Sequence, residues 1–331
     1  MKINKLKTPL TLLTLSVFTQ GCNMISQDTP PKLELATLYD YRLHASQNKS
    51  PISIDQLRDD LAKSDVVFIG EYHSHSASHK LQAELLQAMY LKNPRLILSM
   101  EQFSRDKQQI LNQYLKGEIG EQTLINEGDA WDNYRSDYRP LVEFARNHDL
   151  QVIGANTPLS IVRCIARKGP NFVSELDEEK QSWVAADVKT SSIEYQHKFA
   201  QAMSHHGASN SNNQKVSQSN SFYAQLARDN TMAESIYNAY INNTNSQVIH
   251  FNGAFHSNYN LGTVDALKRL DPTLNITVIS PAFYNEEIEW DKGDYIYIIN
   301  PLPSRYIKKE NRDKSIMKMV KSRKEKKCKI N

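Results

Sequence analysis

The chain has 331 residues, of which 40% are hydrophobic and 23% are charged, and its formal net charge is +3. The charge is uneven, because residues 305–329 hold twelve Lys and Arg against three acidic residues, which leaves about −6 on the remainder. A basic block of this kind usually forms a solvated tail, and its alternative partners are anionic head groups or nucleic acid. We expect a disordered tail over residues 301–331, and the export signal described next argues against nucleic acid.

The first 21 residues predict export. Three lysines precede an apolar run of about ten residues, which is too short to span a bilayer as a mature helix. Residues 1–21 are therefore predicted to be a signal peptide. Gly21-Cys22 resembles the cleavage site of bacterial lipoproteins, although Thr19 stands where that pattern prefers leucine. Acylation of Cys22 would anchor the protein to a membrane; the alternative is ordinary secretion with an incidental cysteine.

The residues after Cys22 refine this expectation. Residues 22–32 form a polar tether, and Asn23 favours the outer membrane by the usual Gram-negative sorting rule. Two further cysteines remain, and an oxidising compartment allows a disulfide between them. However, Cys328 lies in the charged tail and Cys164 lies in an apolar helical run, so we expect Cys164 simply to be buried.

Residues 33–300 predict one α/β domain. Residues 33–61 have the pattern of helix, turn and helix, with Ser53 as the cap of the second helix. Strands and helices then alternate, and the predicted strands are 65–69, 95–100, 151–155, 247–251, 275–279 and an edge strand at 295–299. This alternation predicts a mostly parallel β-sheet covered by helices on both faces. Residues 157–246 contain a smaller inserted helical lobe with a low-complexity loop.

Polar residues follow four of the predicted strands. They are Glu71 with His73, then Glu101, Asn156 and His256. The carboxyl ends of parallel strands meet at one edge of a sheet, where α/β proteins bind their ligands. Burying such groups without partners costs free energy, so one shared site explains the set better than separate helix or loop caps.

One hypothesis for this site is metal-dependent hydrolysis. His73, His256 and Glu101, with His79 nearby, offer the nitrogen and oxygen ligands of zinc or a similar divalent metal. Glu71 and Glu101 are then the catalytic residues, since the carboxylate that does not bind metal activates a water molecule. The alternative is a hydrogen-bonded polar pocket without metal.

A second hypothesis comes from the tyrosines, of which there are sixteen. Tyr134 and Tyr138 follow Trp131 and lie beside Arg135 and Arg139. A phenolate is a known axial ligand of haem iron, and nearby arginine helps to keep it ionised. Aromatic side chains would cover the porphyrin, and Arg or His would meet its propionates. The alternative is that these tyrosines are amphipathic residues that only pack.

Several motifs resemble the ChaN family of haem-binding lipoproteins, within the Tiki superfamily. The resemblance covers about residues 60–280 and runs in the family's order. It rests on motifs that include Gly70-Glu71-x-His73, Met100-Glu101-Gln102-Phe103, Tyr138-Arg139-Pro140-Leu141, Asp229-Asn230-Thr231-Met232-Ala233-Glu234 and Gly253-x-x-His256.

This resemblance implies a parallel α/β domain with a smaller helical lobe and a role in haem or iron uptake. It also implies a homodimer that holds cofacial haems at its interface, with a tyrosine as the iron ligand. Tyr138 is the first candidate and Tyr134 the second, and His73, His79 and His256 are further candidates for haem contact.

The same resemblance keeps the enzyme hypothesis open. Other members of the Tiki superfamily are metal-dependent peptidases with paired Gly-x-x-His motifs and glutamates, and this chain has both. Residues 171–221 and the basic C-terminus have no counterpart in the family pattern.

Overall fold

The computed structural model describes residues 35–205, 219–325, 328 and 330. All described elements belong to one compact unit, Leu35–Asn331. The predicted signal peptide, Cys22 and the tether up to residue 32 lie outside the described residues, as does most of the low-complexity loop. None of the described helices is both long enough and apolar enough to cross a bilayer.

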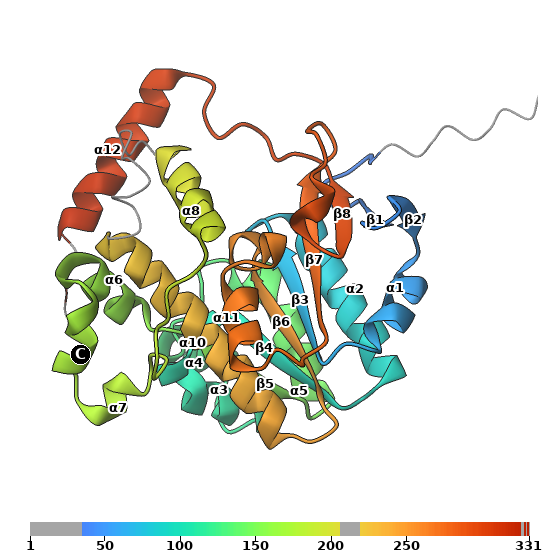
Figure 1. The fold of residues 1–331 in the computed structure, drawn as a ribbon, viewed down its shortest axis with the longest axis horizontal. Helices are drawn as coiled ribbons and strands as arrows, with labels where there is room; N and C mark the ends of the chain where they lie inside the picture. The colour runs from blue at the N-terminus through green and yellow to red at the C-terminus, as the bar shows by residue number, and fades with distance from the viewer. Residues whose placement is uncertain (1–34, 206–218, 326–327, 329, 331) are drawn as a thin grey trace, which may run out of the picture. The chain divides into compact units, whose positions relative to one another are not determined.

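A single eight-stranded sheet forms the centre of this unit, in the order β2-β1-β8-β7-β3-β6-β4-β5 (Figure 1). Six of its strands are parallel to one another: β3 (Val66–Glu71), β4 (Leu96–Ser104), β5 (Gln151–Asn156), β6 (Gln247–Gly253), β7 (Ile276–Phe283) and β8 (Tyr295–Ile299). The prediction of a mostly parallel α/β sheet is confirmed.

The N-terminal part of the prediction was wrong in one respect. Residues expected to form a first helix instead form strand β1 (Tyr41–Ala45), and the expected break at Ser50-Pro51 lies in strand β2 (Ser50–Ile52). Strand β1 pairs antiparallel with both β2 and β8. The predicted edge strand β8 is therefore internal. The second helix, α1 (Ile54–Leu61), forms as expected, with Ser53 as its N-cap.

Helices cover both faces of the sheet, because side chains of each buried strand alternate between two apolar clusters. In β3, Val67 and Ile69 pack on one face and Val66 and Phe68 on the other. The first face is covered by α1, α2 (Ser76–Lys92), α3 (Gln108–Leu115), α4 (Glu121–Glu127) and α5 (Arg139–Asn147). The second is covered by α10 (Asn220–Asn242) and α11 (Thr263–Leu270).

The helical lobe is built on α10. Its other described helices are α6 (Leu159–Lys168), α7 (Glu178–Gln181) and α8 (Ile193–His205), and no strand occurs in the described part of residues 157–246. Short helical turns connect the larger elements: η1 (Arg105–Lys107), η2 (Tyr134–Tyr138, a π-helix), η3 (Pro170–Glu175), η4 (Ala254–His256), η5 (Asn258–Asn260) and η6 (Trp290–Lys292).

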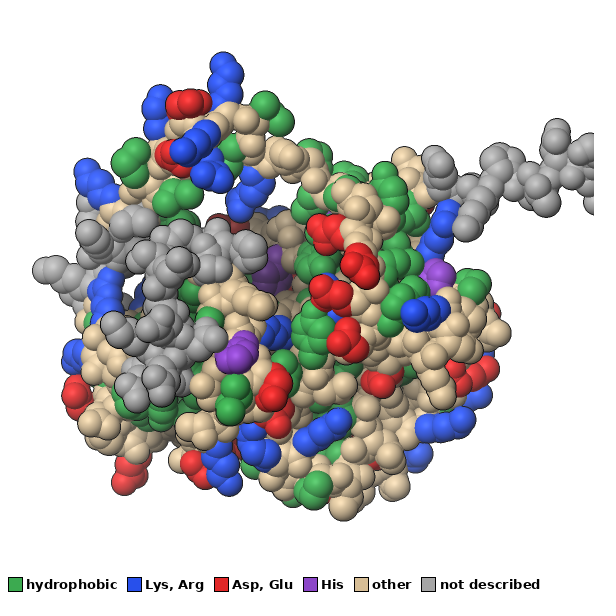
Figure 2. Space-filling model, turned by 45° about the horizontal axis from the view of Figure 1, so that its top comes forward, with side chains coloured by type: hydrophobic (Ala, Val, Ile, Leu, Met, Phe, Trp, Pro, Cys, Tyr) green, Lys and Arg blue, Asp and Glu red, His purple; other side chains and the backbone are tan. Residues whose placement is uncertain are grey.

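The C-terminal segment is not the disordered tail that the charge pattern predicted. It contains helix α12 (Lys309–Glu325), and Lys and Arg side chains gather along it at the top of the molecule in Figure 2.

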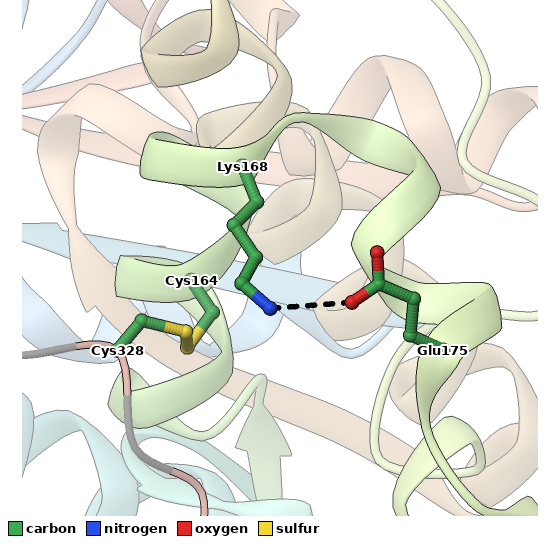
Figure 3. Close-up of a disulfide and its surroundings, with 4 residues drawn as sticks. All are labelled: Cys164, Lys168, Glu175 and Cys328. Carbon is green, nitrogen blue, oxygen red and sulfur yellow. Dashed lines mark hydrogen bonds and ion pairs between the residues drawn. A yellow bond between two sulfur atoms is a disulfide. The ribbon is translucent and has the colours of Figure 1, made fainter.

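After α12 the chain returns to the helical lobe, where Cys328 forms a disulfide with Cys164 of α6 (Figure 3). The two Cα atoms are 4.9 Å apart. Cys164 is buried among Ile161, Ile165 and Phe172, as expected, but it is not a free thiol. The sequence could not show this pairing, because 164 positions separate the two cysteines.

Candidate functional site

The polar residues predicted at the sheet edge do meet there. Glu71 ends β3 directly opposite Gly253, which ends β6, and Glu101 lies on β4, the other neighbour of β6. A cavity of about 1460 Å³ opens at this edge, lined by Glu71, His73, Glu101, Gly253 and His256 among others. Ligand pockets are commonly about 300–1,000 Å³, so this cavity has room for a large ligand.

Glu71 is the centre of a buried hydrogen-bond network. Its Oε1 accepts hydrogen bonds from the Tyr138 hydroxyl at 2.6 Å and from His73 Nδ1 at 2.7 Å. Its Oε2 accepts one from Gln82 Nε2 at 2.7 Å, and His79 Nδ1 is 3.7 Å away. Burial alone would raise the pKa of Glu71, but the His73 hydrogen bond and the His79 charge outweigh it and lower the pKa. Glu71 is therefore an ionised anchor for His73.

Glu101 forms the second buried centre. One carboxylate oxygen accepts a hydrogen bond from Arg228 Nη2 at 2.6 Å, and the other accepts one from the Gly253 backbone N–H, also at 2.6 Å. His256 Nε2 lies 3.5 Å from Glu101. Burial opposes ionisation, but the charges of His256 and Arg228 hold the pKa of Glu101 well below its ordinary value.

His256 lies between two carboxylates. Its Nδ1 is 2.6 Å from Asp229 Oδ1, and Asp229 also accepts hydrogen bonds from the Tyr195 hydroxyl and from Thr263 Oγ1. Burial would lower the pKa of His256, but the charges of Glu101 and Asp229 raise it. The imidazole is thus fixed in orientation and favoured as a cation.

The two histidines of the Gly-x-x-His motifs have parallel surroundings but unequal access. In each, a carboxylate holds Nδ1, an arrangement that orients the ring and increases the basicity of Nε2. The His73 side chain is 46% exposed and lies against Gly253, whereas that of His256 is 5% exposed. His73 is therefore the more accessible of the two to a ligand in the cavity. Burial would lower the pKa of His73, but the hydrogen bond to Glu71 and the charges of Glu101 and Glu71 raise it.

The two tyrosines predicted to bind iron lie inside the protein. Tyr138 is fully buried, and burial followed by the charge of Glu71 raises its pKa. Tyr134 is also buried, its hydroxyl has no hydrogen-bond partner among the described residues, and burial raises its pKa. Both environments oppose a phenolate. The expected arginine partners, Arg135 and Arg139, instead face Glu121.

The predicted metal cluster is not found. Among the described residues, no group of three or more His, Cys, Asp and Glu is arranged to hold a metal ion. His73, His256 and Glu101 do gather at one edge, but both Glu101 oxygens are already hydrogen bonded to Arg228 and Gly253. His79 does not line the cavity; it lies behind Glu71, with Nδ1 hydrogen bonded to Gln82.

Sequence reasoning missed the contribution of α10 to this site. Gln225, Arg228 and Asp229 all reach His256 or Glu101. Their spacing of three and four residues places them on one face of a helix, which is the signal that could have found them.

A lysine of the helical lobe was missed as well. Lys198 of α8 lines the cavity and donates hydrogen bonds to the carbonyl groups of Phe255 and Asn258, each at 2.9 Å. Burial lowers its pKa to about 7. Lys198 thus connects the helical lobe to the loop that carries His256.

Comparison with known proteins agrees with this architecture. The model of the haem-binding uptake family (Tiki superfamily, ChaN) matches residues 57–267. The chain belongs to this family. The match includes both Gly-x-x-His motifs and ends before α12.

One solved structure shows the shared fold. A ChaN structure from Campylobacter jejuni, described as cofacial haem binding, aligns with a TM-score of 0.63 and 18% identity over 79% of this chain and 98% of that one. An erythromycin esterase, EreC, in its open conformation aligns with a TM-score of 0.43 and 12% identity over 84% and 87%. Among curated proteins, RETICULATA-RELATED 5 of Arabidopsis thaliana, a chloroplastic protein, is 29% identical over 86 residues. That match spans 26% of this chain and 12% of the relative.

Proposed function

We propose that this protein binds haem and takes part in haem or iron uptake at the cell envelope. The observation that carries the proposal is membership of the haem-binding uptake family over residues 57–267. The fold shared with the Campylobacter ChaN protein supports it.

The residues around the cavity fit a porphyrin. Trp131, Phe255 and Phe283 provide aromatic surface for the ring, and Arg163 and Arg305 provide positive charge for its propionates. Haem, when bound, supplies an iron centre that one axial side chain can ligate.

The proposal also concerns which side chain ligates the haem iron. The family resemblance implies a tyrosine, and Tyr138 stays the candidate of that class. Its hydroxyl is hydrogen bonded to Glu71 in the interior, so ligation through it requires that bond to break. His73 is the competing ligand, because it lines the cavity and Glu71 already orients its ring.

A haemin titration with two variants tests both levels of the proposal. Haemin added to the protein should give the charge-transfer band of tyrosinate-bound ferric haem, and Tyr138→Phe should abolish that band. If that band survives Tyr138→Phe, another tyrosine is the ligand. If the wild type lacks the band and its Soret maximum shifts in His73→Ala, histidine is the ligand. An unchanged haemin spectrum at stoichiometric protein would refute haem binding.

We also propose that the protein is an exported, lipid-anchored protein of the outer membrane. The signal peptide and Gly21-Cys22 support this location, and the Cys164–Cys328 disulfide suits an oxidising compartment. Labelling with radioactive palmitate in cells tests it: the wild type and Cys328→Ser should incorporate label, and Cys22→Ser should not. Equal labelling of all three would contradict the anchor at Cys22.

A second candidate function is hydrolysis at the same cavity. The observation that favours it is the pair of carboxylate–histidine units, Glu71–His73 and Asp229–His256, in which each imidazole can serve as a general acid or base. Turnover of ester and peptide substrates is measured with and without added zinc. If the site is hydrolytic, the wild type turns over a substrate in at least one condition and His73→Ala does not. Activity that is absent, or unchanged in His73→Ala, would leave the paired histidines a binding role only.

A further inference from the structure

The basic C-terminal segment is held on the body of the protein at both ends. At its start, Arg305 lines the cavity at the sheet edge. At its end, Cys328 is joined covalently to α6. Helix α12 between them is therefore a fixed surface feature, which a solvated tail is not (Figure 1).

The charge on this segment is largely uncompensated. Seven cationic side chains are described between residues 305 and 321, against Glu310 and Asp313, and the one ion pair recorded there joins Arg312 to Asp313 at 3.5 Å. Lys314, Lys318 and Lys321 are exposed at spacings of four and three, so they form one stripe along α12. Figure 2 shows blue side chains gathered over this helix.

Large apolar side chains are exposed on the same segment. Met317 follows Lys314 by three positions and precedes Lys321 by four, so it lies beside them on α12. Ile307 precedes the helix, and Met319 lies on another side of it. Ile307 is 89% exposed, Met317 64% and Met319 41%. Exposed apolar side chains that are grouped with charged ones are typical of protein or membrane interaction sites. A helix that offers both lysines and apolar side chains matches the boundary of an anionic bilayer, where lysines meet head groups and apolar groups enter the acyl layer.

We propose that α12 and Ile307 form a membrane-contact face that binds anionic phospholipid. The proposal does not depend on haem binding or on acylation of Cys22. Because Arg305 lines the cavity just before this face, contact with the bilayer places the cavity near the membrane surface, where an apolar ligand partitions.

Vesicle co-sedimentation of the chain from Asn23 onward tests the proposal. This form lacks the predicted acylation site and retains the compact unit Leu35–Asn331. It should bind vesicles of phosphatidylglycerol mixed with phosphatidylcholine, and bind phosphatidylcholine alone far more weakly. The triple variant Lys314→Glu, Lys318→Glu, Lys321→Glu should lose on the order of 100-fold in partitioning, since each surface lysine contributes about fivefold.

The matched control reverses three exposed lysines elsewhere, Lys63, Lys116 and Lys268, which carries the same change in net charge. This control should bind as the wild type does. Equal loss in the two triple variants, or equal binding of the wild type to both kinds of vesicle, would overturn the proposal.

Two further measurements keep the proposal falsifiable if charge reversal unfolds α12. Wild-type binding should disappear in about 1 M salt, where screening extends only ~3 Å, and persistence there would refute a face that depends on lysine. Ile307→Ser with Met317→Ser should weaken vesicle binding and leave heparin binding unchanged. Heparin binding without vesicle binding would show a general polyanion surface and also refute the proposal.

Discussion

At the scale of single residues, Gly253 allows the Glu71–His73 and Asp229–His256 pairs to lie together at one edge of the sheet. A Cβ atom at this position would lie 2.7 Å from His73 Nε2 and 2.8 Å from its Cε1. The backbone φ of −58° is open to any residue, so the requirement for glycine comes from the neighbouring imidazole and not from backbone strain.

Gly253→Ala should therefore displace His73 from the cavity wall. We expect a loss of about 1–3 kcal/mol in unfolding free energy, typical of overpacking, and a weakened Glu71–His73 hydrogen bond. Chemical denaturation measures the first, and the His73 pKa by NMR measures the second, which should fall toward its ordinary value. Gly120→Ala, where a Cβ meets nothing within 4 Å, is the control. A His73 pKa that does not change in Gly253→Ala would contradict the steric argument.

The ionisable groups of the site also set a stability window in pH. Glu71 and Glu101 have lowered pKa values, so their stabilisation is present above the ordinary value of 4.5 and is lost as pH falls through the folded-state pKa. His73 and His256 have raised pKa values, so theirs is present below 6.5 and is lost as pH rises through the folded-state pKa.

Thermal unfolding in the presence of a chelator should therefore show the highest Tm between about 4.5 and 6.5. Glu101→Gln should lower the Tm within that window and flatten the acid limb, because Arg228 loses its buried partner and one titrating group is gone. An acid limb of equal slope in wild type and variant would show that Glu101 does not contribute to it.

At the scale of elements, the sequence predicted those parts that depend on local pattern. Strands β3 to β8 are apolar runs followed by Gly or polar residues, and their positions were recovered. Strand β1 was missed because its burial is mostly partial, with only Leu43 fully buried, and its pairing with β8 is remote in sequence. The site shows the same division between local and remote signals. The predicted residues Glu71, His73, Glu101 and His256 lie at or just after strand ends. Arg228 and Asp229, which were missed, come from a helix of the lobe.

The position of α12 depends on the disulfide, since its own side chains are mostly exposed. Cys328→Ser should speed trypsin cleavage within α12 and lower the unfolding free energy by about 2–5 kcal/mol, since the bond closes a long loop. Cys164→Ala should have a similar effect, and the double variant should be no worse than the larger single effect. Additive losses would mean that the two cysteines stabilise the protein independently of their bond.

At the scale of the whole molecule, the proposed haem site and the homodimer that the family resemblance implies are linked by mass action. If haem lies between two copies of the chain, each haem bound must also favour the dimer, since a ligand that binds only one state stabilises that state. A ligand held within a single chain would leave the mass unchanged.

Sedimentation velocity during a haemin titration distinguishes these arrangements. The mass should double as haemin approaches one equivalent per chain, and the Soret change and the mass change should share one midpoint. Metal-free protoporphyrin, which has the same ring and propionates but no iron, should drive dimerisation less if iron ligation contributes to the interface. A complete Soret change at constant mass would place haem inside one chain, in the cavity beside His73, and would contradict the expected homodimer while keeping haem binding.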